Sequence, residues 1–210
     1  MSQRIVVLIS GRGSNLAAIL AAGLPVVAVI SNRQDAIGLT LARGHSIPTS
    51  VVHQHDHADR QSFDLALCHE IDRHQPDLVV LAGYMRILSD DFVNHYTGRL
   101  INIHPSLLPA YPGLHTHRKV LEDGVRIHGC TVHFVTTELD HGPIIIQAAV
   151  PVLSDDNEDM LASRVLLAEH HILPEAIRWF LAGRLKITPQ GIVNLAQAGR
   201  SEQGKMFHDD

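Results

Sequence analysis

Three side chains of this 210-residue chain have types and spacing that could do chemistry together: Asn102, His104 and Asp140. Asn102 and His104 lie at the end of a short apolar run, residues 100–103, and Pro105 stops it because proline has no N–H for a strand ladder. Residues two apart on a strand project to the same side. In an open α/β sheet, ligands bind beyond the carboxyl ends of the strands. An amide, an imidazole and a carboxylate there suit acyl transfer, as oxyanion donor, proton donor and orienting base.

A plainer interpretation of the same residues stays open. An Asn-x-His sequence before proline can be a helix cap or a solvated turn. The chain has 16 histidines, most of which cannot be catalytic. Residue types alone therefore do not separate a catalytic turn from an ordinary one.

The composition is that of an ordinary globular chain. Hydrophobic residues make up 45% and charged residues 19%, and the formal net charge is −5 without a block of Lys and Arg. Nucleic acids and membrane surfaces need clustered cations, so we predict small-molecule substrates, with no nucleic acid and no membrane as partner. The two cysteines, Cys68 and Cys130, have no paired spacing. The apolar run at residues 5–9 is too short for a signal peptide, which predicts a cytoplasmic protein.

Apolar runs alternate with helical patterns through the first half of the chain. Strands are expected at residues 5–10, 26–31, 49–52, 78–82 and 100–103. Helices are expected at 15–22, 37–43 and 60–74, and from an N-cap at Ser89 to residue 96. This order predicts an α/β fold with an open, mostly parallel, twisted sheet and helices on both faces.

The pattern changes after His104. A helix at residues 118–123 precedes two long strands, 130–135 and 144–150, which we expect as antiparallel additions in the C-terminal half. Residues 155–182 are predicted as a long helix that Pro174 kinks or interrupts, and residues 185–193 as a hairpin. One domain is expected over residues 1–196, followed by a frayed polar tail at 197–210.

Two loops that follow predicted strands could hold ligands. Residues 11–15, Gly-Arg-Gly-Ser-Asn, open a helix, so their backbone N–H groups could hold an anion. A dinucleotide fingerprint needs glycine where Leu16 stands, which favours a single phosphate over a nicotinamide cofactor, although a plain turn stays open. Residues 83–88, Gly-Tyr-Met-Arg-Ile-Leu, follow the most hydrophobic strand and could line a flat heterocycle.

The stretch 102–109, together with residues 139–143, resembles the signature of the folate-dependent formyltransferases, and the likeness extends over residues 5–185. The run at 104–117, His-Pro-Ser-Leu-Leu-Pro-Ala-Tyr-Pro-Gly-Leu-His-Thr-His, is similar to members that act in purine synthesis. The resemblance implies a Rossmann-like formyltransferase fold. It implies transfer of the formyl group of 10-formyltetrahydrofolate to the amine of 5′-phosphoribosylglycinamide, by direct attack of the amine and without a covalent enzyme intermediate.

The resemblance also implies roles for individual residues. Asn102 and a protonated His104 would hold the oxyanion, and Asp140 would assist proton transfer to the leaving folate nitrogen. The ribonucleotide would contact the first loop and part of the long helix, at Gly13, Ser14, Asn15, Leu166, Leu167, Ala168 and Glu169. The folate would contact Arg60, Met85, Arg86, Ile87, Leu88, Asn102, Thr136, Thr137, Glu138, Leu139 and Asp140. Without the family, Arg60 and Glu169 are ordinary surface residues of helices.

Two groups of histidines need separate comment. The alternating His53, His55 and His57 would face one way in a strand, as a set of metal ligands could. We favour a surface loop over a metal-ligand set, and the family chemistry uses no metal. His141 stands where the family usually has glycine or an acid, so it could place a second imidazole near the reaction. Its role stays open, as does a homodimer.

Three other functions compete with the formyl transfer. Formyltetrahydrofolate hydrolase shares the Asn-His-Asp set but typically carries an N-terminal regulatory domain, whereas the catalytic fold here starts at Ile5. Methionyl-tRNA formyltransferase carries a C-terminal RNA-binding domain, for which this chain ends too early and too acidic. A catalytically silent folate- or phosphate-binding protein is disfavoured by the intact Asn102, His104 and Asp140.

Overall fold

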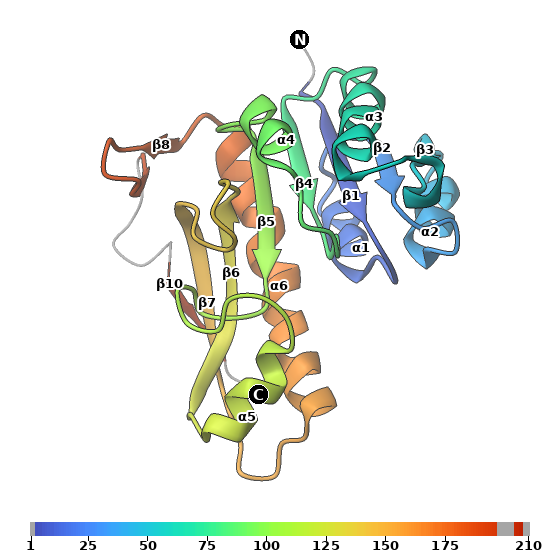
Figure 1. Cartoon of the computed structure of the whole chain (residues 1–210). Coiled ribbons are helices and arrows are strands. Elements are labelled where there is room, and N and C mark those ends of the chain that lie inside the picture. Colours follow the sequence, from blue (N-terminus) through green and yellow to red (C-terminus); the bar gives the residue numbers. More distant parts are fainter. Residues whose placement is uncertain (1–2, 197–203, 208–210) are drawn as a thin grey trace. The chain divides into compact units, whose positions relative to one another are not determined.

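The computed structural model describes residues 3–196 and 204–207 and has an eight-stranded, mostly parallel sheet with helices and a separate two-stranded sheet (Figure 1). Antiparallel pairing occurs in the C-terminal half, so the fold class predicted from the sequence is confirmed. The chain divides into two compact units, Met1–Asn102 and Ile103–Asp210. The single domain expected over residues 1–196 stays a prediction.

The first unit is a parallel sheet in the order β4-β1-β2-β3, with the start of β5 paired in parallel to β4. Its central strand β1 is fully buried, because a parallel strand covered by helices on both faces must be apolar at every position. The strands are β1 (Ile5–Ile9), β2 (Val26–Ser31), β3 (Thr49–Val51), β4 (Leu78–Leu81) and β5 (Leu100–His104).

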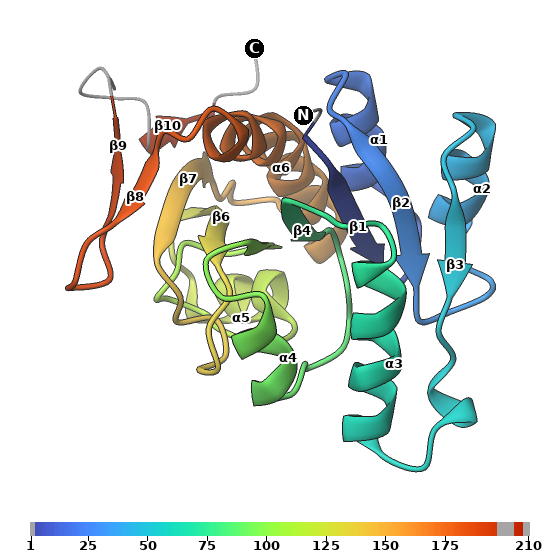
Figure 2. The ribbon, with the colours of Figure 1, turned by 90° about the horizontal axis from the view of Figure 1, so that it is seen from above.

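Helices cover both faces of these strands, as predicted: Figure 2 shows α1 and α2 on one face and α3 on the other. Ser89 is the predicted N-cap and accepts a hydrogen bond from the N–H of Phe92 at 3.4 Å. Asp59 and Ser62 form a capping box at the start of α3 that the sequence analysis did not identify. The helices are α1 (Ser14–Ala21), α2 (Ile37–Gly44), α3 (Arg60–Asp72) and α4 (Asp90–His95).

The alternating histidines do not lie in a strand. Residues Gln54–Asp56 form a short 3₁₀ turn, η1, with His55 exposed, so the surface loop favoured for His53, His55 and His57 over one face of a strand is confirmed. The polar residues between the histidines offer no apolar side chain that a strand could bury, and a turn keeps them in solvent.

The second unit is built on an antiparallel pair, β6 (Ile127–Phe134) and β7 (Ile144–Pro151), against which the long helix α6 (Glu158–Leu181) packs. Asn157 caps α6 by accepting a hydrogen bond from the N–H of Met160 at 2.9 Å. The predicted terminal hairpin is present as β8 (Leu185–Ile187) and β9 (Val193–Leu195), and α5 (Thr116–Asp123) starts two residues earlier than expected.

Two features of this unit differ from the expected ones. Pro174 does not interrupt α6, since one continuous helix passes through it, and a kink at Pro174 stays a prediction. One backbone hydrogen bond is lost at a proline, and buried residues on both sides, Leu173 and Ile177 among them, hold the helix together. The tail is not frayed throughout, because β10 (Gly204–Met206) pairs in parallel with β7. The rest of the predicted tail, residues 197–203 and 208–210, lies outside the described residues.

Candidate active site

His104 and Asp140 form a buried pair in the second unit. His104 ends β5, and its Nδ1 lies 3.6 Å from Oδ2 of Asp140; the two side chains are only 7% and 8% exposed. This distance suits an ion pair but is too long for a hydrogen bond. The structure therefore brings together two of the three side chains first singled out in the sequence, although they are 36 positions apart (140 − 104).

Backbone groups of the loop after β5 fix both members of the pair. The N–H of Gly113 donates to Oδ2 of Asp140 at 2.8 Å. Nε2 of His104 lies 3.0 Å from the carbonyl oxygen of Tyr111 and must carry the proton, because a carbonyl can only accept. In this state Nε2–H is bound within the protein, so it must leave Tyr111 before it can stabilise charge on a substrate.

Asp140 occupies a strained turn that a glycine makes possible. Asp140 has φ 55°, in the left-handed region. A Cβ on Gly142 would lie 1.7 Å from the carbonyl oxygen of Phe134, so no other residue fits there without moving the strand. The N–H of Phe134 donates to the carbonyl oxygen of Pro143 at 2.9 Å, which ties the turn to the end of β6. The Asp-His-Gly-Pro sequence thus holds the turn against β6 and aims the carboxylate at His104.

Further histidines of this unit lie around the pair and are electrically neutral near pH 7. Burial lowers the pKa of His133 to about 4, although the Phe134 carbonyl and Asp140 act in the opposite direction. Burial, with the nearby His117 and His104, lowers the pKa of His128 to about 4 as well. Nε2 of His133 lies 4.0 Å from Oδ1 of Asp140. Because His128 and His133 carry no charge near pH 7, they do not compete with His104 for the carboxylate of Asp140.

Asn102 lies two residues before His104 on β5, in the register of β4 opposite Leu81. It is half-buried, whereas the apolar residues on either side of it are buried. His104 is buried as well, so burial does not alternate along β5, and the projection of Asn102 and His104 to one side of the strand stays a prediction.

In the first unit, the loop after β1 is shaped by two glycines in close contact. Gly13 has φ 78° and is the N-cap of α1, without a side-chain cap. A Cβ on Gly13 would lie 2.7 Å from Cα of Gly38, whose N–H donates to the carbonyl of Gly11 at 3.1 Å. The glycine is thus required by the packing of the chain itself. Ser14 and Asn15 follow in the first turn of α1, which contains no acidic residue, so its positive end can accept an anion.

The loop after β4 is attached to β1 and exposes two apolar side chains. The N–H of Met85 donates to Oγ of Ser10 at 2.8 Å, and that hydroxyl donates to Asn32 at 2.7 Å. Met85 and Ile87 are 69% and 62% exposed, whereas Leu88 is buried. Exposed apolar side chains on a fixed backbone are what a flat heterocycle needs.

The two arginines next to this loop have different environments. Arg60, at the start of α3, donates from Nη2 to the carbonyl oxygen of Leu88, and its side chain is 48% exposed. Arg86 instead lies over the ring of Phe63, 4.1 Å from the centroid, and donates to Gln54. Arg60 therefore keeps donors for a ligand carboxylate, while the guanidinium of Arg86 is used in packing.

The chain matches the family model described as formyl transferase over residues 3–177. It belongs to the formyl transferase family. Over 189 residues it is 56% identical to phosphoribosylglycinamide formyltransferase of Escherichia coli K12, which covers 87% of this chain and 89% of that protein. The crystal structure of glycinamide ribonucleotide transformylase 1 from Symbiobacterium toebii has a TM-score of 0.91 at 47% identity, covering 93% of this chain and 94% of that one.

A solved structure of a protein with another name is similar at lower sequence identity. The formyltetrahydrofolate deformylase of Pseudomonas syringae pv. tomato has a TM-score of 0.87 at 29% identity, and the match covers 94% of this chain but 67% of that one. The fold alone therefore does not identify the acceptor of the formyl group.

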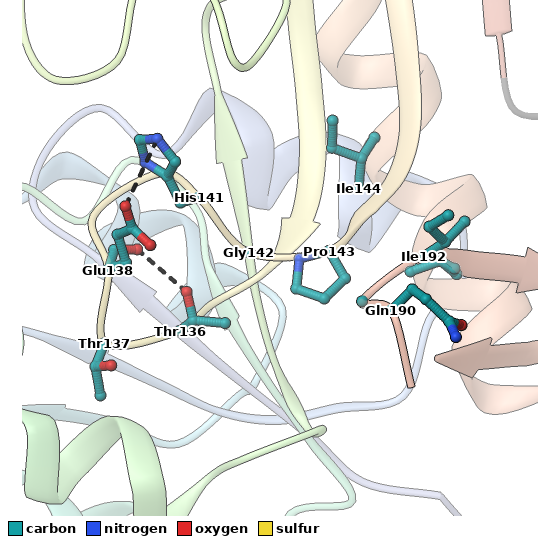
Figure 3. A pocket seen from close by; sticks show the side chains of 11 residues that line it. Thr136, Thr137, Glu138, His141, Gly142, Pro143, Ile144, Gln190 and Ile192 are labelled. Carbon is teal, nitrogen blue, oxygen red and sulfur yellow. Dashed lines mark hydrogen bonds and ion pairs between the residues drawn. The ribbon is translucent and has the colours of Figure 1, made fainter. Parts of the chain in front are cut away.

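His141 of this formyl transferase contacts residues of its own turn. Its Nδ1 is 2.8 Å from the carbonyl oxygen of Leu139, and its Nε2 is 3.8 Å from the carboxylate of Glu138. Figure 3 shows His141 above Glu138 at a pocket of about 660 Å³, whose other wall includes Gln190 and Ile192 of the turn between β8 and β9. Of the predicted folate residues, Thr136, Thr137 and Glu138 also line this pocket.

The segment of α6 predicted to contact the ribonucleotide is split between the core and solvent. Leu167 is exposed, whereas Ala168 and Glu169 are buried, and Leu166 is half-buried. The interpretation of Glu169 as an ordinary surface carboxylate is therefore wrong, because its side chain is buried. A charge buried in this way needs a group that compensates it. Within residues 3–196 and 204–207, no cluster of three or more His, Cys, Asp and Glu side chains is arranged to hold a metal ion.

Sequence reasoning did not select the buried polar residues of β6. His128, Thr131 and His133 lie in a strand that is otherwise apolar, and all three are buried. Thr131 accepts from the N–H of Leu108 at 3.1 Å and donates to the carbonyl of Ser106 at 2.7 Å, which fixes the loop after His104. Polar residues in an apolar strand were the available signal, because a buried polar group needs a partner.

Proposed function

We propose that this protein transfers the formyl group of 10-formyltetrahydrofolate to the amine of 5′-phosphoribosylglycinamide, in purine biosynthesis. The products are formylglycinamide ribonucleotide and tetrahydrofolate. The observation that carries the proposal is the buried His104–Asp140 pair at the end of β5, in a chain of the formyl transferase family. The high identity to a phosphoribosylglycinamide formyltransferase supports this acceptor over others.

The amine attacks the formyl carbon directly. Its lone pair forms the new C–N bond, the carbonyl electrons move to oxygen, and collapse of that oxyanion breaks the bond to the folate nitrogen. The proton lost by the amine is delivered to the departing nitrogen, so no oxidant or covalent enzyme intermediate is needed. Positioning the two substrates supplies much of the rate, because the amine is already a competent nucleophile.

Three side chains serve the oxyanion and the proton. The Asn102 amide and the imidazolium of His104 donate to the oxyanion, once Nε2–H of His104 leaves the Tyr111 carbonyl. Asp140 orients the imidazole and offsets its positive charge from 3.6 Å. Asp140 also passes the proton through water to the folate nitrogen.

Each substrate has a site in the proposal. The phosphate of the ribonucleotide binds at Gly13, Ser14 and Asn15, where the N-terminus of α1 offers backbone N–H groups. Its glycinamide end is bound with help from the α6 segment Leu166–Glu169. The folate lies on Met85, Arg86, Ile87 and Leu88 and on residues 136–140, with Arg60 at its carboxylate end.

The remaining expectations concern the setting of the protein. The described residues include no helix long and apolar enough to cross a bilayer. We propose that the protein is cytoplasmic and that its substrates are small molecules. The homodimer stays a prediction, which sedimentation velocity can test. The family chemistry assigns no step to a metal.

Formate release and acceptor dependence test the function. Purified protein is mixed with a 10-formylfolate donor, with and without glycinamide ribonucleotide, and both formate and formylated ribonucleotide are measured. We expect donor consumption only with the ribonucleotide present. Formate release without an acceptor would establish a hydrolase, and formylation of methionyl-tRNA would establish the tRNA enzyme. Donor binding without turnover under any condition would establish a silent binding protein.

A further inference from the structure

Asp64 is a buried carboxylate that no step of the proposed mechanism uses. It lies on α3, one turn after Arg60, and is 2% exposed. Its Oδ2 accepts a hydrogen bond from the N–H of Ser89 at 2.6 Å and lies 4.0 Å from Nε of Arg60. A carboxylate is costly to bury, so its retention in the core needs a reason.

The contacts of Asp64 connect α3 to the end of the loop at residues 85–88. Arg60 donates to the carbonyl of Leu88, and the next residue, Ser89, donates its N–H to Asp64. Two residues of α3 thus bind two consecutive residues of the loop. At the other end of the loop, Met85 is bound to Ser10. The backbone between these points is therefore held from both sides.

The negative charge of Asp64 is not needed for the bond to Ser89. An asparagine side chain has the same shape and can accept from the same N–H through its carbonyl oxygen. The group that distinguishes a carboxylate from an amide is the guanidinium of Arg60, which is half exposed and donates to the backbone carbonyl of Leu88. The charge therefore acts on the orientation of Arg60.

We propose that Asp64 is a positioning residue of the donor site, which holds the Arg60 guanidinium against Leu88 and aims its remaining donors at a carboxylate of the folate. This inference rests on the proposed function, because it assumes that the loop at 85–88 and Arg60 bind the formyl donor. It assigns to Asp64 an effect on donor affinity and none on the chemical step.

Asp64→Asn separates the positioning role from a structural one. The donor Kd and KM should rise about fivefold, as expected for loss of one partly solvated charge interaction. The KM for glycinamide ribonucleotide, the kcat at saturating donor and the melting temperature should stay near their wild-type values. Asp90→Asn is the matched control, because it removes an exposed charge beside Ser89 without touching Ser89 N–H or Arg60, and it should leave donor affinity unchanged.

A double-mutant cycle tests whether Asp64 acts through Arg60. Arg60→Met weakens donor binding by itself, and adding Asp64→Asn to it should cause no further loss. Additive losses, or unchanged donor affinity in Asp64→Asn, would overturn the inference while leaving the proposed function intact. Wild-type protein that does not bind 10-formyl-5,8-dideazafolate in calorimetry would overturn both.

Discussion

The contact between Gly13 and Gly38 predicts that the smallest possible side chain at position 13 is strongly destabilising. Gly13→Ala adds one methyl group where the backbone has φ 78° and where Cα of Gly38 lies 2.7 Å from the new carbon. The neighbour is backbone and is held by its own hydrogen bond to Gly11, so it cannot move aside cheaply. The perturbation is therefore resisted by both conformation and packing.

The two costs can be worked out separately. A left-handed conformation costs an L-residue about 1–2 kcal/mol relative to glycine. Overpacking a well-packed site costs about 1–3 kcal/mol more. Gly13→Ala should therefore lower the free energy of unfolding by about 2–5 kcal/mol. Gly23→Ala is the matched control, since Gly23 has φ 68° but open space around its Cβ position, so it should cost only the first amount.

Urea unfolding followed by far-UV circular dichroism measures both variants against the wild type. The loss of unfolding free energy should be at least about 1 kcal/mol larger for Gly13→Ala than for Gly23→Ala. Equal losses would show that the loop relaxes freely and that the contact with Gly38 carries no energy. The result also bears on function, because any effect of position 13 on ribonucleotide binding must be separated from this structural cost.

Three further outcomes are expected. His104→Ala and Asp140→Ala should each lower kcat about 10²–10⁴-fold in a steady-state assay with donor binding retained, and near-wild-type turnover would contradict their roles. Because burial lowers the pKa of His133 to about 4, the unfolded chain binds a proton between pH 6.5 and 4 that the folded chain does not. As the pH is lowered from 6.5 to 4, the free energy of unfolding should decrease by up to about 3 kcal/mol. The decrease should be less steep in His133→Gln, and urea titrations at several pH values measure both. His141→Gly should leave the pH profile of kcat/KM superimposable on that of the wild type, since His141 contacts Leu139 and Glu138 instead of the catalytic pair.

The regular elements and the end of β5 were predictable because local patterns determine them. The fully apolar run at β1 and the Ser89 cap are each visible within a few residues. Pro105 and the polar residues before it marked the end of a strand, and the resemblance added a role in proton transfer for Asp140. In these cases the local signal and the tertiary structure agree.

Other features depend on residues far apart in the chain, which no local pattern records. The contact of Gly13 with Gly38 and the neutral His128 and His133 arise from packing. The packing of Arg86 on the ring of Phe63 likewise joins residues that no local pattern connects. The strand β10 was missed because a three-residue segment in a polar tail has no periodicity to read, and its pairing with β7 supplies the order.

The central claim is that this chain moves a formyl group from folate to the amine of glycinamide ribonucleotide. The most direct test is a single turnover with a donor labelled with ¹³C in the formyl group, followed by NMR of the products. The account predicts that the label appears quantitatively in the formamide of formylglycinamide ribonucleotide, and that it does not in Asp140→Ala on the same time scale. Label recovered as formate, or unchanged donor after long incubation with the wild type, would contradict it.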